Sequence, residues 1–276
     1  MTLELVAVWG AIAGYVVASV LFIIGAFLGK PRLLRAGVIA AAVGLASHAV
    51  AIGARWIRIG HGPYLGFYEV ASLLAFLSVL GFLLLQWRYE GLRIGGVVCM
   101  PIAFLILGAT LLVNSEAQAV TGSLASFWLV IHVLFANLAY GFYAAAFALA
   151  SAYLLRDSRW AERYGSVLAK FPAQEELDSL TFRIVGAGFV FQGIMIASGS
   201  IWANQAWGSY WSWDAIETWS LLAWAIYAIY LHLTLTLGWR GRRAAWVIVI
   251  ALPVILFSLL GVPIFYNSIH GAYLAV

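Results

Sequence analysis

Residues 5–28 read LVAVWGAIAGYVVASVLFIIGAFL, an apolar run without a charged side chain or a proline. A helix that crosses the hydrocarbon core of a bilayer needs about 20 mostly apolar residues, and its backbone polar groups must be hydrogen-bonded within the segment. This run meets both requirements, and similar runs recur along the whole chain. It therefore predicts a membrane-spanning helix, and the similar runs indicate that the rest of the chain is also built from such helices.

About eight such runs are expected to span the membrane. They cover residues about 5 to 28, 36 to 54, 70 to 87, 94 to 113, 127 to 155, 181 to 202, 219 to 238 and 244 to 266. Of the 276 residues, 64% are hydrophobic and only 9% are charged, whereas a soluble domain has about 25% charged residues. We expect an all-α, polytopic transmembrane helix bundle that forms a single membrane domain over residues 1–276.

The basic residues lie in short clusters between the apolar runs, and the clusters alternate between the two sides of the membrane. One side receives Lys30, Arg32, Arg35, Arg88, Arg93, Arg156, Arg159, Arg163, Lys170, Arg240, Arg242 and Arg243. The other side receives only Arg55 and Arg58. By the positive-inside rule the first side is cytoplasmic, so both termini are expected to be extracytoplasmic. The formal net charge of +4 therefore indicates orientation in a lipid membrane and not binding to nucleic acid.

A tryptophan-rich segment separates the sixth and seventh predicted spans, on the outer side. Residues 203–217 contain Trp207, Tyr210, Trp211 and Trp213 but no basic residue. The segment is too apolar for a solvated loop, so we expect it to lie on the membrane surface. Aromatic residues often anchor a protein at the interface, but this cluster is too dense for that role alone. Flat aromatic faces can stack on a porphyrin and exclude water, which favours a heme platform.

The five histidines occupy informative positions. His48 and His232 lie inside predicted spans, where an ionisable side chain is costly and usually functional. His132 lies about one and a half turns into the fifth span from its outer end, and His61 and His270 lie in outer segments. For a single intramembrane histidine, hydrogen bonding to a neighbouring helix and ligation are both open. Two imidazoles from different elements can hold a six-coordinate heme, and His132 and His270 bracket the tryptophan-rich segment.

The chain has one cysteine, Cys99, inside an apolar run. This count excludes an intrachain disulfide, a CxxC redox pair and a cysteine-based metal cluster. We expect Cys99 to be a small buried apolar residue.

Two blocks of sequence resemble a known family. Residues 207–219 read WGSYWSWDAIETW and are followed by YLH at 230–232, which resembles the WWD signature of heme-handling proteins. Residues 55–63 read RWIRIGHGP, followed by Tyr68 and Glu69, which is similar to a second element of the same family. The chain most resembles the CcsA (ResC) family of System II cytochrome c biogenesis. It departs from the family at Ala215 and Ile216, where Pro and Lys are usual.

The resemblance implies a set of heme b ligands and contacts. Trp207, Trp211, Trp213 and Asp214 would bind heme in the WWD segment, about residues 202–219, with His132 and His270 as outer axial ligands. His232 would bind heme within the membrane, with either His48 or a residue of a CcsB-like partner as the second ligand.

The resemblance also implies a function and partners. The chain would be the heme-delivery subunit of a System II cytochrome c synthase (heme lyase) complex, which attaches heme to the CxxCH motif of apocytochrome c through external thioether bonds. A CcsB-like membrane subunit and a separate thiol-reducing pathway are implied, as is a plasma membrane or a thylakoid-type membrane. The protein itself need supply little acid–base catalysis.

Other interpretations stay open. A cytochrome b-like subunit that oxidises quinol is the alternative function, although such proteins commonly place two histidines on one helix. Arg55 and Arg58 could pair with heme propionates or hold a helix end at the interface. Glu69 and Asp214 each precede a predicted span, so both are expected to cap helices.

Overall fold

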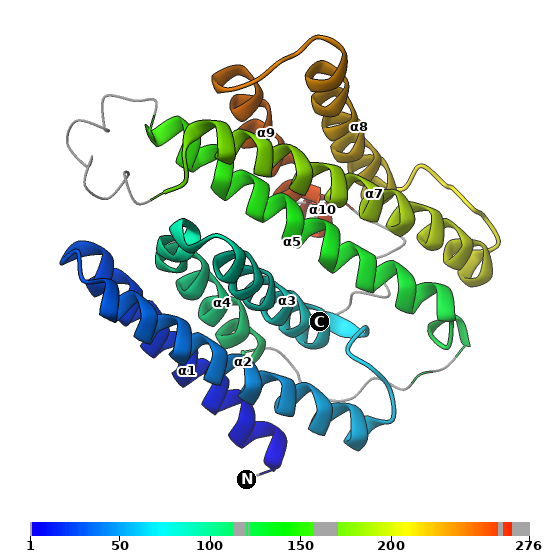
Figure 1. Ribbon diagram of the computed structural model, residues 1–276. Coiled ribbons are helices and arrows are strands. Elements are labelled where there is room, and N and C mark those ends of the chain that lie inside the picture. Colours follow the sequence, from blue (N-terminus) through cyan, green and yellow to red (C-terminus); the bar gives the residue numbers. More distant parts are fainter. Residues whose placement is uncertain (1, 113–119, 121, 157–170, 259–261, 267–276) are drawn as a thin grey trace. The chain divides into compact units, whose positions relative to one another are not determined.

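The computed structural model describes residues 2–112, 120, 122–156, 171–258 and 262–266, and all regular elements in these ranges are helices (Figure 1). The longer ones are α1 (Leu3–Phe27), α2 (Pro31–Ile59), α3 (Gly66–Arg88), α4 (Gly96–Thr110), α5 (Phe127–Arg156), α7 (Gln174–Trp207), α8 (Ala215–Thr236) and α9 (Arg242–Leu256). Three short ones are η1 (Glu90–Gly95), η2 (Gly122–Leu124) and α10 (Val262–Phe265). The prediction of an all-α fold is confirmed.

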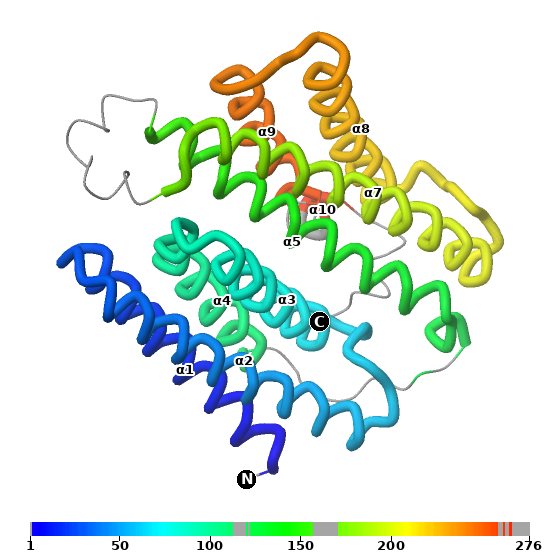
Figure 2. The backbone as a smooth tube through the Cα atoms, in the orientation of Figure 1, coloured from blue at the N-terminus to red at the C-terminus, as the bar shows by residue number. Residues whose placement is uncertain are grey.

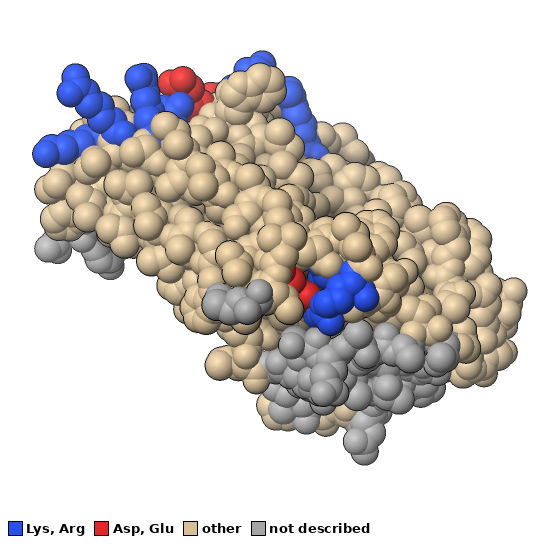
Figure 3. Space-filling view, turned by 90° about the horizontal axis from the view of Figure 1, so that it is seen from below, with Lys and Arg blue, Asp and Glu red and all other residues tan. Residues whose placement is uncertain are grey.

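Seven helical segments in the described ranges are long and apolar enough to cross a membrane: α1, α2, α3, η1 with α4, α5, α7 and α8. The chain is therefore a multi-pass membrane protein. On the face shown in Figure 3, broad parts of the described surface carry neither acidic nor basic side chains. The eighth predicted span begins as α9, but residues 259–261 within it lie outside the described ranges.

The helices form two compact units. The first contains α1 to α4 with η1, and the second contains α5, α7, α8, α9 and α10 with η2 (Figure 2). We expected a single membrane domain over residues 1–276. Whether the two units together form that domain stays a prediction.

In the first unit, α1 and α2 are an antiparallel pair in close contact. A Cβ atom on Gly14 would lie only 2.6 Å from the Cα atom of Gly44, so both positions require the smallest residue. Nearby, the Ser47 hydroxyl donates to the carbonyl oxygen of Ala7 at 2.8 Å. Close backbone approach and interhelical hydrogen bonds are the usual means of association in lipid, where the hydrophobic effect does not drive helices together.

In the second unit, a buried polar network joins α5, α7 and α8. The rings of Tyr143 on α5 and Tyr227 on α8 stack with centroids 3.6 Å apart. The Tyr143 hydroxyl donates to Gln192 Oε1 on α7 at 2.7 Å, and Gln192 Nε2 donates to the Ser220 carbonyl oxygen on α8 at 2.9 Å. These contacts fix the three helices relative to one another. They thereby position the end of α7 and the start of α8, which carry the tryptophan-rich segment.

Candidate functional site

The tryptophan-rich segment is a short connection between two helices with defined ends. α7 ends at Trp207, where Gly208 adopts φ 80° and donates its N–H to the carbonyl oxygen of Asn204. α8 begins after Asp214, whose side chain accepts from the N–H of Ile216 at 3.3 Å. The predicted capping role of Asp214 is therefore confirmed. Its predicted contact with heme stays a prediction.

Glu217 completes a capping box at this helix start. Its Oε2 atom accepts from the N–H groups of Asp214, at 3.2 Å, and of Ser212, at 2.9 Å. Trp213 lies between these two donors and has φ 58°. Its side chain is 70% exposed, and its ring meets that of Trp211 edge-on with centroids 5.8 Å apart. The segment therefore presents one indole outward from a restrained backbone.

His132 lies on α5, five residues after the helix begins at Phe127. Its Nδ1 atom is 2.9 Å from the carbonyl oxygen of Met195 on α7. A carbonyl oxygen can only accept, so Nδ1 carries the proton and the lone pair of the neutral ring is on Nε2. This is the tautomer of a metal-binding histidine whose other nitrogen is held by a carbonyl.

An aromatic row joins His132 to the tryptophan-rich segment. The His132 ring stacks on Trp202 with centroids 6.5 Å apart, and Trp202 meets Trp207 edge-on at 5.3 Å. The Trp202 indole also donates to the Ser123 carbonyl oxygen at 2.9 Å. The start of α5 and the end of α7 therefore lie at the same end of the second unit. His132 and the first tryptophan of the WWD block belong to one cluster.

His232 lies on α8, near the end of the helix distant from the tryptophan-rich segment. Its side chain is exposed on the surface of the chain, and Nδ1 is 3.3 Å from the Thr236 hydroxyl one turn later. Placing an imidazole on the lipid-facing surface of a membrane-spanning helix costs free energy when lipid is its only neighbour. Such a position suits a ligand shared with another element or subunit.

His48, in contrast, is a fully buried side chain in the first unit. Its Nδ1 atom is 3.1 Å from the Tyr15 hydroxyl, and Nε2 is 2.9 Å from the Ser72 hydroxyl. Both ring nitrogens thus have hydrogen-bond partners, so ligation of iron would require one of these bonds to break. His270, the predicted outer ligand near the C-terminus, lies outside the described residues.

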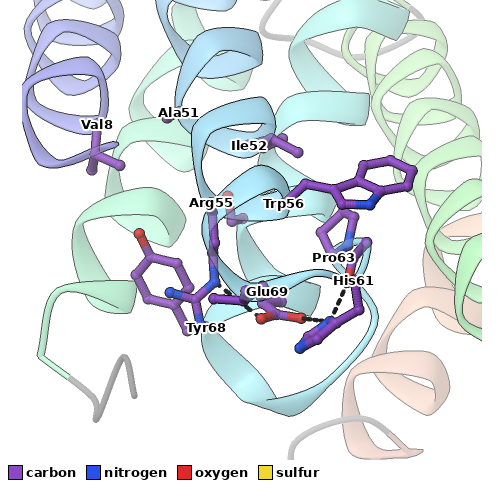
Figure 4. A pocket seen from close by; sticks show the side chains of 12 residues that line it. Val8, Ala51, Ile52, Arg55, Trp56, His61, Pro63, Tyr68 and Glu69 are labelled. Carbon is purple, nitrogen blue, oxygen red and sulfur yellow. Dashed lines mark hydrogen bonds and ion pairs between the residues drawn. The ribbon is translucent and has the colours of Figure 1, made fainter. Parts of the chain in front are cut away.

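A buried charge cluster lies at one end of the first unit, between α2 and α3. Glu69 lies between the guanidinium of Arg55 and the ring of His61 (Figure 4). Arg55 Nε donates to Glu69 Oε1 at 3.0 Å, and Nη1 lies 3.2 Å from Glu4 Oε1. Arg55 is therefore committed to two carboxylates. Of the two predicted arginine roles, this geometry favours fixing the end of the helix over pairing with propionates.

Glu69 does not precede the third span as predicted, because α3 begins at Gly66 and Glu69 lies in its first turn. From there its carboxylate accepts from the N–H of the N-cap residue Leu65 at 3.0 Å, so Glu69 caps the helix start from inside the helix. His61 Nδ1 is 2.9 Å from the Gly62 carbonyl oxygen, which places the ring lone pair on Nε2. That Nε2 atom is buried without a hydrogen-bond partner among the described residues. In the same loop, burial raises the pKa of Tyr64, and the Glu69 carboxylate adds to the increase.

Comparison with known proteins identifies the family. A family model described as cytochrome C assembly protein matches residues 37–270. The chain belongs to this family. It is 34% identical to the cytochrome c biogenesis protein CcsA of Parasynechococcus marenigrum (strain WH8102), over 89% of this chain and 90% of that protein. It is 30% identical to CcsA of Gloeobacter violaceus (strain ATCC 29082 / PCC 7421), over 95% and 93% respectively.

A solved structure, cytochrome c heme lyase CcmF, is similar to this cytochrome c assembly protein in fold. The TM-score is 0.70 at 18% sequence identity, with 99% of this chain covered. The chain spans about half of that solved chain, 49% of its length. At this identity the likeness concerns the fold alone. The family itself confirms the resemblance predicted from the WWD block and supports a role in cytochrome c maturation.

Three features of this cytochrome c assembly protein were not predicted from the sequence. They are the Met195 carbonyl that holds His132, the close approach of Gly199 to the same ring, and the two-sided contact of Glu217 around Trp213. Only the last has a local signal, because Asp214 and Glu217 stand at the spacing of a capping box. The other two arise from helices that are far apart in sequence.

Proposed function

We propose that this cytochrome c assembly protein binds heme b on histidine ligands and presents it at the outer membrane surface to the CxxCH motif of apocytochrome c. Family membership supports the general role in cytochrome c maturation. The observation that carries the finer proposal is the aromatic row from His132 through Trp202 to Trp207. It joins a histidine of suitable tautomer to a segment with an outward-facing indole.

The described residues fit heme as a substrate. The His132 Nε2 lone pair is suited to iron, because Nδ1 donates to the Met195 carbonyl. The exposed ring of Trp213 offers a flat face to a porphyrin. The indole N–H of Trp211 is buried without an acceptor among the described residues, so it can donate to a polar group of the ligand. His270 is proposed as the second outer ligand, as the family resemblance implies.

In this proposal, the chain's contribution to the reaction is to hold heme and to orient it. Thioether formation adds each cysteine S–H of the CxxCH motif across a heme vinyl group, so the bonds form between substrate groups. The proposed role of His132 and the tryptophans is to keep the vinyl edge accessible and to exclude water from the porphyrin face. The single cysteine, Cys99, cannot form a dithiol pair that would keep the substrate thiols reduced, so a separate thiol-reducing pathway is proposed.

The charges of the second unit support the proposed orientation. The N–H of Gly241 donates to Asp178 Oδ1 at 3.0 Å, so the α8–α9 connection lies beside the start of α7. The tryptophan-rich segment joins the opposite ends of α7 and α8. Arg240, Arg242 and Arg243 therefore lie far from that segment. Basic residues favour the cytoplasmic side, which supports an extracytoplasmic platform.

The exposed position of His232 supports a second, intramembrane heme ligand. A ligand from a CcsB-like partner would meet this side chain without disturbing the helix packing of the second unit. His48 is less suited to that role, because Tyr15 and Ser72 already engage its ring.

The test is heme binding and cytochrome c maturation by matched tryptophan variants. Trp213→Ala removes the outward-facing indole, and Trp87→Ala removes an indole that is 80% exposed at the end of α3. The proteins are purified in mild detergent for absorption spectra, and holocytochrome is measured by covalent heme stain. We expect maturation to fail in Trp213→Ala alone. An unsubstituted protein that purifies without any heme would overturn the proposal.

A further inference from the structure

Glu217 contacts the backbone on both sides of Trp213. Its Oε2 atom accepts from the N–H of Ser212 at 2.9 Å and from the N–H of Asp214 at 3.2 Å. The Ser212 hydroxyl also lies 3.3 Å from each of the two carboxylate oxygens. Because Trp213 is the residue between these donors, the carboxylate closes a turn around it.

This turn holds Trp213 in a conformation that it would not adopt by itself. Trp213 has φ 58°, whereas the other positive-φ residues in the described ranges are glycines. A bulky residue in the left-handed region is strained and persists only where its surroundings restrain it. The two bonds to Glu217 supply restraint before and after Trp213, and the Thr218 hydroxyl donates to the Trp213 carbonyl oxygen at 3.3 Å.

The contacts of Glu217 exceed what helix capping requires. In the capping box, the N–H of Asp214 donates to the Glu217 carboxylate, and the two donors of Ser212 are not part of that motif. Glu217 is 7% exposed, and no lysine or arginine pairs with it in the described part of the chain. Its carboxylate is stabilised instead by backbone and hydroxyl donors and by the start of α8.

We propose that Glu217 is a positioning residue of the heme platform, the tryptophan-rich segment proposed to bind heme. Glu217 holds Trp213 in the left-handed conformation that directs its indole outward. The inference rests on the proposed function, because it names the residue that shapes the platform. Glu217 acts through the backbone of residues 212–214 and does not touch the reacting atoms. The conformation of Trp213 therefore depends on the position of the Glu217 acceptor oxygen and not on the negative charge of the carboxylate.

Three variants separate geometry from charge. Glu217→Gln keeps an acceptor oxygen at the same distance from the backbone and removes the charge. Glu217→Asp keeps the charge but shortens the side chain by one methylene, which moves the carboxylate away from the backbone of residues 212–214. Glu217→Ala removes both the charge and the acceptor oxygen. We expect Glu217→Gln to mature cytochrome c nearly as well as the unsubstituted protein. The Asp and Ala variants should mature about tenfold less, which corresponds to about 1.4 kcal/mol.

The readouts are holocytochrome by covalent heme stain, total co-purified heme by pyridine extraction, and the amount of chain in the membrane. Should Glu217→Ala fail to accumulate, the comparison of Gln with Asp decides, since both keep a polar side chain. Full maturation by Glu217→Asp together with loss in Glu217→Gln would assign the function to charge and overturn the proposal. Equal maturation in all three variants would also overturn it.

Trp213→Ala distinguishes this inference from the proposed function. Failure of Trp213→Ala with normal maturation in all Glu217 variants would leave the platform intact and remove only the positioning role. Normal maturation in Trp213→Ala would contradict the platform itself.

Discussion

The imidazole of His132 on α5 donates through Nδ1 to the carbonyl oxygen of Met195 on α7, at a distance of 2.9 Å. This bond orients the ring and selects the tautomer with its lone pair on Nε2. The same carbonyl also accepts from the Ser198 hydroxyl at 3.1 Å. A candidate ligand on one helix is thus positioned by the backbone of another.

His132→Ala and His270→Ala test the proposed outer ligand pair. Each should reduce cytochrome c maturation by at least about tenfold, since loss of a metal ligand costs at least as much as loss of its supporting contact. Heme held within the membrane should remain, because neither residue belongs to that site. Holocytochrome by covalent heme stain and total heme by pyridine extraction separate the two effects. Normal maturation in both variants would reduce these histidines to packing residues.

Gly199→Ala tests the positioning of His132 without altering the histidine. A Cβ atom at Gly199 would lie 2.5 Å from His132 Nδ1, so the ring must shift away from the position in which it bonds to Met195. Maturation should fall by about tenfold, as expected when a supporting contact of a ligand is lost. Gly186→Ala on the same helix is the control, because an added Cβ there meets nothing within 4 Å. Equal maturation by the two variants would contradict the role of the Met195 bond.

His232→Gly tests the proposed intramembrane ligand. The variant should purify with less heme, because an exposed imidazole on α8 would no longer be available to iron. Added imidazole should partly restore the heme content and the absorption spectrum. Leu235→Gly, at a side chain that is 70% exposed on the same helix, controls for weakening of the helix by glycine. The assignment is refuted by a His232→Gly protein with unchanged heme and an unchanged spectrum.

Ser209→Cys tests the side on which the tryptophan-rich segment lies. The background is Cys99→Ala, which removes the single native cysteine. We expect Ser209→Cys to react with an impermeant thiol reagent in intact cells, because the basic residues of the second unit lie at the opposite helix ends. Arg240→Cys should react only after membrane disruption. The reverse pattern would invert the proposed topology.

Arg55→Met tests the buried charge cluster. The substitution leaves Glu4 and Glu69 without their shared cation, and removal of one partner of a buried ion pair costs about 3–5 kcal/mol. Arg58→Met is the control: Arg58 also pairs with Glu4, but its side chain is 49% exposed, so the loss should stay below about 1 kcal/mol. Thermal unfolding in detergent measures both. A similar unfolding temperature for the two variants would contradict a structural role for Arg55.

Much of the fold could be predicted because span formation is a local property. The run that begins at Leu5 must form a helix wherever it enters lipid, and it does so as α1. Capping by Asp214 and Glu69 was predictable for the same reason, since donor and acceptor are a few residues apart. The family was predictable from residues 207–219, which lie together in the chain.

The sequence by itself determined the helices, their caps and the candidate ligands. Helical hydrogen bonds, capping bonds and apolar runs all involve residues that are close together along the chain. Only the tertiary structure decided how those candidates are held. It paired both nitrogens of His48 with Tyr15 and Ser72, left His232 exposed, and bound His132 to Met195. These outcomes depend on which atoms of distant helices meet, and side-chain hydrogen bonds are directional over about 3 Å. No pattern along the chain encodes such a meeting.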